Sequence, residues 1–159
     1  MSDLLLGGGE LGATSHPGGI RTLALGSCVA VILLDPKTGC VGMDHVALPD
    51  SKVSPDKRKT RPGYFADTGI PELIESMKGA GAAPGQYRVK LVGGAAVMDP
   101  NSTFNIGKRN VLAIKKVLWR FGMGALAEDV GGQISRTVRV EAGAGAVTIS
   151  SPGRPDWGL

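Results

Sequence analysis

Two apolar runs separated by a short polar turn constrain most strongly how this chain can fold. Residues 30–34 and 40–48 are mostly apolar and contain β-branched side chains, which is typical of strands. The residues between them, Asp35-Pro36-Lys37-Thr38-Gly39, have the composition of a turn. The pattern predicts a β-hairpin in which Asp35 faces Cys40.

This pairing brings a cysteine and a histidine to one face of the predicted sheet. Cys28 lies opposite Ala47. His45 lies opposite Ala30. Because side chains alternate between the two faces of a strand, Cys28 and His45 share a face as diagonal neighbours, about 7–8 Å apart at the backbone. A shift of one residue would place them on opposite faces. The face therefore carries the two groups that thiolate attack on a carbonyl or carboxamide carbon requires.

The residues before Cys28 suit a nucleophile. Gly26 and Ser27 form a bend at the start of an apolar strand, where the backbone can approach a substrate closely. Backbone N–H groups at this bend are candidate donors to an oxyanion, although Ser27 is also an ordinary turn residue. A neighbouring imidazolium would favour the reactive thiolate. From these residues alone, Cys28 is either a nucleophile or an inert core thiol, and His45 is either a base or a hydrogen-bonded core side chain.

The length of 159 residues suits a single domain with its own core, which we expect to span residues 1–159. Within it, residues 1–17 are predicted to form an irregular lead and residues 152–159 a loose tail. The apolar runs are too short to cross a membrane, and the N-terminus lacks the pattern of a secretory signal. We therefore expect a cytoplasmic protein without membrane insertion, whose cysteines stay reduced.

The rest of the chain mixes strand and helix signals without a regular alternation. This arrangement predicts an α+β domain with hairpins rather than a βαβ series. The expected strands are 20–25, 87–92, 137–142 and 146–150, and the expected helices are 70–78 and 108–121.

Positive charge gathers in residues 52–62, within a formal net charge of +4. The segment holds two prolines and no periodic pattern, so it predicts a loop. It is either a solvated surface loop or a docking edge for an acidic partner. A nucleic-acid partner is disfavoured because no aromatic side chains interleave with the basic ones.

No metal or cofactor is expected. The two cysteines and the two histidines lack the short paired spacing of structural zinc sites, and we expect His16 to lie in a surface loop. The glycine-rich segments lack the Gly-Lys-Ser/Thr ending of a phosphate-binding loop.

A set of short motifs follows one another from about residue 18 to residue 150. The most specific pair is Leu25-Gly26-Ser27-Cys28 and His45-Val46-Ala47-Leu48-Pro49-Asp50-Ser51. The others are Tyr64-Phe65-Ala66-Asp67-Thr68, Lys90-Leu91-Val92-Gly93-Gly94-Ala95, Asn105-Ile106-Gly107-Lys108-Arg109-Asn110 and Gly131-Gly132. In this order they resemble the CheD family of chemoreceptor glutamine deamidases. Ser135-Arg136 departs from the family pattern, which usually has Gly-Arg.

The resemblance implies a cysteine hydrolase that converts particular chemoreceptor glutamines to glutamates with release of ammonia. Carried over by position, it makes Cys28 the nucleophile, His45 the general base and acid, and Thr22 the side chain that orients the imidazole. It also implies a layered sandwich of mixed or antiparallel sheets flanked by helices, similar to the catalytic domains of deamidating bacterial toxins.

The same resemblance implies the partners. Methyl-accepting chemoreceptors would be the protein substrate, and some family members also bind a CheC-type phosphatase. A non-catalytic adaptor for either partner is the alternative function. We expect a monomer with no nucleic-acid partner.

Overall fold

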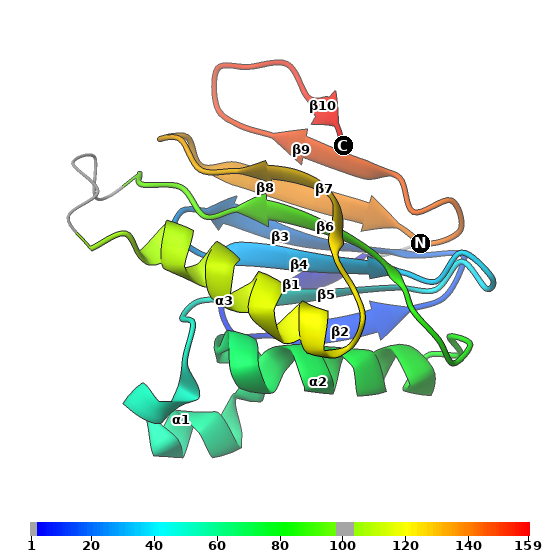
Figure 1. Cartoon of the computed structure of the whole chain (residues 1–159). Helices are drawn as coiled ribbons and strands as arrows, with labels where there is room; N and C mark the ends of the chain where they lie inside the picture. The colour runs from blue at the N-terminus through cyan, green and yellow to red at the C-terminus, as the bar shows by residue number, and fades with distance from the viewer. Residues whose placement is uncertain (1–2, 98–103) are drawn as a thin grey trace.

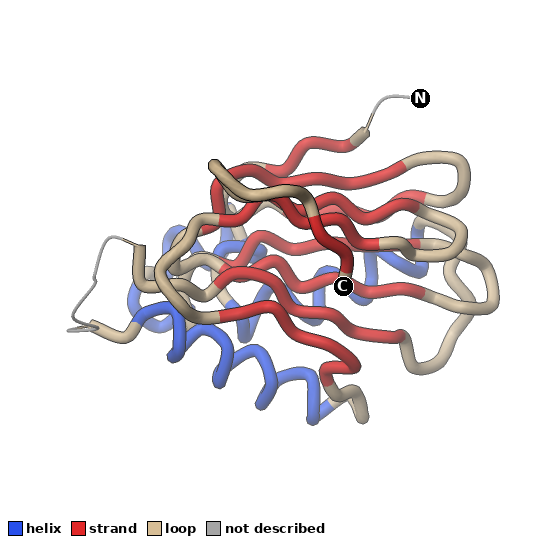
Figure 2. The backbone as a smooth tube through the Cα atoms, turned by 90° about the horizontal axis from the view of Figure 1, so that it is seen from above, coloured by secondary structure: helices blue, strands red, loops and turns tan. Residues whose placement is uncertain are grey.

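Two packed β-sheets with helices on one side make up the computed structural model, which describes residues 3–97 and 104–159 (Figure 1). Seen from above, the strands run side by side across the molecule and α3 (Ile106–Arg120) lies along one side of them (Figure 2). Within the described ranges, no helix has both the length and the apolar content needed to cross a bilayer. The α+β class expected from the sequence is confirmed.

The first sheet contains five strands in the order β1-β3-β8-β9-β10. The pair β1–β3 is parallel, and the other neighbours are antiparallel. The strands are β1 (Leu4–Leu6), β3 (Gly19–Leu25), β8 (Arg136–Glu141), β9 (Val147–Ser150) and β10 (Trp157–Gly158).

The second sheet also has five strands, in the order β2-β5-β4-β6-β7. Its one parallel pair is β6–β7, which α3 connects as a crossover helix. The strands are β2 (Leu11–Thr14), β5 (Val41–Val46), β4 (Val29–Leu34), β6 (Arg88–Gly93) and β7 (Ala125–Val130). Both sheets are therefore mixed.

The helices gather on the outer face of the second sheet (Figure 1). Two of them, α2 and α3, pack against it, whereas α1 is short and has no buried residue. Their bounds are α1 (Pro55–Thr60) and α2 (Ala66–Gly79), with single 3₁₀ turns η1 (Ser51–Val53) and η2 (Pro62–Tyr64) on either side of α1.

Strand β4 shows how the three layers hold together. On one face, Ala30 and Ile32 pack against the first sheet. On the other face, Val31 and Leu33 pack against the helices. All four side chains are buried, which explains why this strand is continuously apolar instead of alternating with polar residues.

The first hairpin has the predicted register. The N–H of Asp35 donates to the carbonyl of Cys40 at 2.9 Å. Further along the ladder, Ala30 pairs with His45. Their side chains consequently point to the face between the two sheets. Cys28, just before the start of β4, contacts the same face.

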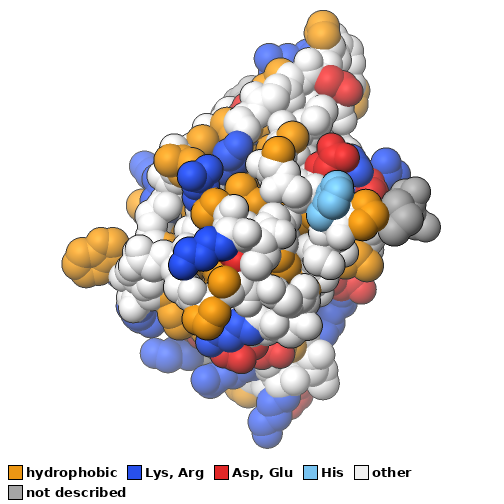
Figure 3. Space-filling model, turned by 90° about the vertical axis from the view of Figure 1, so that its right-hand side faces the viewer, with side chains coloured by type: hydrophobic (Ala, Val, Ile, Leu, Met, Phe, Trp, Pro, Cys, Tyr) orange, Lys and Arg blue, Asp and Glu red, His pale blue; other side chains and the backbone are white. Residues whose placement is uncertain are grey.

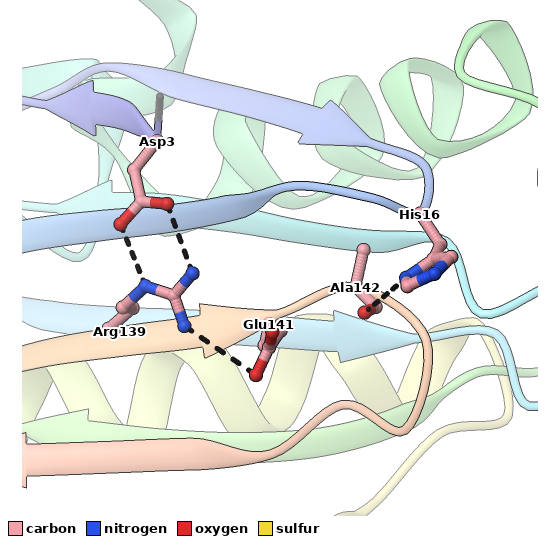
Figure 4. Close-up of polar contacts among 5 residues, drawn as sticks. All are labelled: Asp3, His16, Arg139, Glu141 and Ala142. Atoms are coloured by element: carbon pink, nitrogen blue, oxygen red, sulfur yellow. Dashed lines mark hydrogen bonds and ion pairs between the residues drawn. The ribbon is translucent and has the colours of Figure 1, made fainter. Parts of the chain in front are cut away.

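The prediction of an irregular lead over residues 1–17 is wrong, because β1 and β2 lie in it. Each adds an edge strand to a different sheet. A run of three leucines has no alternation that marks a strand, and its partner β3 begins more than ten residues later in the chain. Just before β1, Asp3 binds Arg139 of β8 through two hydrogen bonds of 2.7 and 3.1 Å (Figure 4).

The prediction of a loose tail over residues 152–159 is also wrong. Trp157 of β10 pairs with Ile149 of β9, and its indole N–H donates to Asp129 at 2.6 Å. Lys90 donates a hydrogen bond to the carbonyl of Leu159, which packs against the core between the sheets. These contacts are tertiary, so the Pro- and Gly-rich local sequence could not show them.

Two further segments differ from the sequence-based expectation. Residues 55–60, expected as part of a loop, form α1, which begins with Pro55 at its first position. Residues 125–130, which no pattern assigned, form β7. Glu128 and Asp129 interrupt the alternation of apolar residues that marks a strand. In the structure these carboxylates form ion pairs with Lys115 and Arg136.

His16 lies in an exposed turn between β2 and β3, as expected. Its Nδ1 is 3.3 Å from the carbonyl of Ala142 (Figure 4). This turn and the bend that precedes Cys28 are at opposite ends of β3. The surface at the His16 end of the sheets shows cationic and anionic side chains interspersed, with hydrophobic atoms in separate patches (Figure 3).

Asp44 on β5 is a fully buried carboxyl, and neither of its oxygens has a hydrogen-bond partner among the described residues. Its side chain points away from the neighbouring His45 and toward α2. Gly69 of α2 makes room for it, since a Cβ there would collide with Asp44 Oδ2. Burial raises the pKa of Asp44 well above its usual value of 3.8.

Replacing Asp44 by Asn should remove a pH-dependent loss of stability. The folded state holds the Asp44 proton more tightly than the unfolded state, so wild-type stability falls as the pH rises from 3.8 to the raised pKa. Each pH unit in that window costs about 1.4 kcal/mol, and Asn has no proton to lose. Urea unfolding of both proteins at about pH 4 and about pH 7 tests this. An equal pH response of the two proteins would contradict it.

Candidate active site

The bend over residues 26–28 joins β3 of the first sheet to β4 of the second. Cys28 ends this bend, is half-buried, and packs against the core between the sheets. A nucleophile placed here is supported by both layers and keeps an exposed side. The position agrees with the sequence-based expectation of a cysteine that opens an apolar strand.

The structure joins Thr22 and His45 directly, although they belong to different sheets. Thr22 on β3 is fully buried, and its Oγ1 lies 2.6 Å from Nδ1 of His45 on β5. The same hydroxyl donates to the carbonyl of Leu6 on β1 at 2.7 Å. Because a carbonyl only accepts, the single hydroxyl proton is used there, and Thr22 must accept from His45. The proton of neutral His45 is therefore on Nδ1, and Nε2 has a free lone pair.

Cys28 and His45 face the same side of the second sheet. The ladder pairs Ala30 with His45 and Val29 with Val46, so Cys28 continues it opposite Ala47. This is the diagonal relation that the sequence predicted. The Cys28 thiol and the His45 imidazole, both described, form no hydrogen bond to each other. Hydrogen bonds between catalytic groups are often long or absent before a substrate is bound.

Burial disfavours the charged forms of both groups. It raises the pKa of the Cys28 thiol above its usual 9.0, and the N–H of Cys28 itself opposes this effect only in part. It lowers the pKa of His45 below 6.5, against the weaker attraction of nearby Glu10. The resting site therefore holds a neutral thiol and a neutral imidazole, and differs from the thiolate–imidazolium pair considered from the sequence.

The carbonyls of the bend are tied to the segment that follows β6. The N–H of Ala95 donates to the carbonyl of Gly26 at 2.8 Å. The N–H of Gly94 donates to the carbonyl of Cys28 at 2.8 Å. Within the described chain, the N–H groups of Gly26, Ser27 and Cys28 donate to no other residue. The bend thus presents unpaired donors, as an oxyanion site requires.

Asn110 on α3 ties the remaining carbonyl, and sequence reasoning gave it no role. Its Nδ2 donates to the carbonyls of Ser27 at 2.9 Å and of Ala47 at 3.0 Å. A polar residue on the apolar stripe of the helix, one turn before Ile114, marks this position in the sequence but does not show its partners. The side chain is fully buried.

A cavity of about 340 Å³ opens beside Ser27, between the start of α3 and the Gly94–Ala95 segment. Small residues line most of it, together with Ile106. Ile106 also lines a second pocket of about 320 Å³, to which Arg109 contributes as well. The two hollows therefore adjoin each other along the first turn of α3.

The second pocket leads into a groove of about 540 Å³ between α3 and the segment after β5. Its α3 wall carries Arg109, Lys116 and Arg120, and Lys52 also lines it. No ion pair engages these four cations within the described residues. We call this hollow the α3 groove.

The two carboxylates of the α3 groove are engaged locally. Asp67 accepts hydrogen bonds from the N–H and the hydroxyl of Ser51, at 2.9 and 2.6 Å. Asp50 accepts from the N–H of Lys52 at 2.9 Å. The groove therefore offers more unpaired positive than negative charge, which suits an anionic partner.

Nothing in the described ranges gathers the side chains that a metal ion needs: no group of three or more His, Cys, Asp and Glu is present. Cys40 is buried in the other core, with its Sγ 3.8 Å from the carbonyl of Met77, and both cysteines are free. Cys28 is thus the cysteine with access to a substrate.

Comparison with known proteins shows the family of the chain. A family model described as "CheD chemotactic sensory transduction" matches residues 47–151. "Probable chemoreceptor glutamine deamidase CheD" of Syntrophotalea carbinolica is 54% identical over 160 residues, covering 99% of each chain. "Chemoreceptor glutamine deamidase CheD" of Thermotoga maritima is 42% identical over 149 residues, covering 94% of this chain and 92% of the relative. A relative from Solibacter usitatus with the first of these names is 45% identical over 135 residues, or 85% of this chain and 80% of its own length. The chain therefore belongs to the CheD family.

Proposed function

We propose that this protein is a chemoreceptor glutamine deamidase, which hydrolyses glutamine side chains to glutamate and ammonia. The observation that carries the mechanism is the Thr22–His45 hydrogen bond, whose direction leaves Nε2 free as a base. Cys28 on the same face supplies the nucleophile. Relatives that cover nearly all of the chain bear the name of this activity.

The reaction follows from the protonation states of the resting site. Nε2 of His45 removes the proton of the Cys28 thiol as Sγ attacks the carboxamide carbon. Negative charge passes to the substrate oxygen, which the N–H groups of the bend stabilise. The intermediate collapses to a thioester when His45 returns the proton to departing ammonia. Water, deprotonated by Nε2, then adds to the thioester and releases glutamate and the thiol.

The proposed compartment is the cytoplasm, because the nucleophile must remain reduced. Both cysteines are free, and thiols persist in the reducing cytoplasm. An oxidising compartment would favour modification of half-buried Cys28 over that of fully buried Cys40.

We further infer that the chemoreceptor segment lies in the α3 groove. The groove adjoins the hollows that reach Ser27, so a chain lying in it passes the nucleophile. Each turnover leaves a carboxylate on the receptor, so a receptor with several target sites becomes more anionic. The unpaired cations of the groove are complementary to such a segment.

Replacing Cys28 by Ala should abolish deamidation and preserve the fold. The measurement is the mass gain of about one dalton at receptor glutamines, the change from amide to acid in the thioester route. Cys40→Ala is the matched control, since it removes the other sulfur and should keep activity. Normal turnover by Cys28→Ala would show that the nucleophile is misassigned. Wild-type protein that binds receptor without any mass gain would favour the adaptor function.

The pH dependence of kcat/KM should show an acid limb with its midpoint below 6.5. Burial lowers the pKa of His45, so the base form persists below pH 6.5 and is lost only as the pH falls through that lowered pKa. On the alkaline side, the raised pKa of Cys28 places thiol ionisation above 9.0. A rate that rises with thiol ionisation instead of with His45 deprotonation would contradict base catalysis by His45.

Changing Arg109, Lys116 and Arg120 together to Gln should raise KM for receptor and leave kcat unchanged. With about 0.2–1 kcal/mol for each exposed ion pair lost, the three changes predict roughly a 3- to 160-fold rise in KM. The matched control changes residues 57–59 of α1 to Gln, which removes the same charge outside the groove. A larger rise in KM for the α1 variant would place the receptor on α1 instead.

A further inference from the structure

Asn110 is held between the nucleophile bend and the strand that carries His45. Both hydrogens of its Nδ2 are used, on the carbonyls of Ser27 and Ala47, at 2.9 and 3.0 Å. Two carbonyls can only accept, so the amide nitrogen and not the oxygen must face them. The orientation of the amide is thereby fixed by its partners.

The amide oxygen of Asn110 has no hydrogen-bond partner among the described residues, although the side chain is fully buried. An unsatisfied buried acceptor destabilises the folded state, whereas an apolar side chain of similar size would avoid this cost. The position therefore retains a polar side chain for its two donated hydrogen bonds and not for core packing.

The bond to Ser27 orients one particular peptide group. The carbonyl of Ser27 and the N–H of Cys28 belong to the same planar trans peptide, so they point in opposite directions. Holding the carbonyl toward α3 turns the N–H of Cys28 away from the helix. That N–H donates to no other described residue.

The other constraints on the bend come from backbone groups of Gly94 and Ala95. These groups are seated against α3, because a Cβ at Gly107 would collide with the carbonyl of Gly94. Asn110 is one helical turn further along the same helix. It is thus the side chain through which α3 acts on the Ser27–Cys28 peptide.

We propose that Asn110 is a positioning residue that presets the N–H of Cys28 as an oxyanion donor. Its second bond, to Ala47, anchors the chain two residues beyond His45 and so keeps base and nucleophile in register. The inference rests on the proposed deamidase function, because the oxyanion arises only when a carboxamide is attacked. An unheld Ser27–Cys28 peptide can rotate its N–H away from the developing charge.

The test compares two reactions of Cys28 in Asn110→Leu and Asn110→Asp. Leu has a similar size but no donors, and Asp has no amide hydrogens and offers the two carbonyls at most one O–H, in its protonated form. Deamidation develops an oxyanion, whereas alkylation of the thiol by iodoacetamide attacks a saturated carbon and develops none. We expect kcat for receptor deamidation to fall about 10²- to 10³-fold in both variants, with KM and the alkylation rate close to those of wild type.

Ile114→Val is the control for general weakening of α3, because Ile114 lies in the helix-facing core, whereas Cys28 packs against the core between the sheets. It should keep kcat even where its melting temperature falls as much as that of an Asn110 variant. Parallel losses of deamidation and alkylation would mean a collapsed site and would overturn the positioning role, as would an unchanged kcat. Wild-type protein that is alkylated at Cys28 but deamidates no receptor would instead reject the proposed function, and the inference with it.

Discussion

The single proton of the Thr22 hydroxyl determines what His45 can do. Because the hydroxyl donates to the carbonyl of Leu6, it can only accept from the imidazole, and the His45 proton is held on Nδ1. Without Leu6, the hydroxyl could donate to Nδ1 instead, and the proton would then occupy Nε2 and block it as a base. A backbone carbonyl of a three-residue edge strand therefore selects the tautomer on which proton transfer depends.

This dependence makes the packing of the two sheets part of the chemistry. Thr22 comes from the first sheet, His45 from the second, and Cys28 from the bend that passes between them. The core between the sheets holds the three positions relative to one another, since interiors at crystal-like packing density allow little rearrangement. A small shift of one sheet against the other would change the 2.6 Å distance between Thr22 Oγ1 and His45 Nδ1 even if each sheet kept its own hydrogen bonds.

The sequence could predict contacts between residues that are close along the chain, but not contacts between distant ones. The first hairpin depends on a turn and two adjacent runs, so it was predictable from residues 28–48. The register that places Cys28 and His45 on one face was chosen for its chemistry, because the turn sequence does not force it. The strand of Leu6 was not predictable, because three leucines acquire a strand conformation only by pairing with β3. The role of Asn110 was not predictable either, since its partners at Ser27 and Ala47 lie more than 60 residues away. For Thr22, the family resemblance and not its own environment indicated a role.

Burial also determines where catalytic power must come from. Both Cys28 and His45 are pushed toward their neutral forms, so the site does not store a reactive thiolate before substrate arrives. Charge appears only during attack, when the sulfur proton moves to Nε2 and the electrons move to the carboxamide oxygen. Stabilisation must then act on that oxygen, which makes the orientation of the bend at residues 26–28 more decisive than a preformed ion pair. A protonated resting thiol also reacts slowly with oxidants and other electrophiles, and its reactivity is thereby reserved for a carboxamide held at the bend.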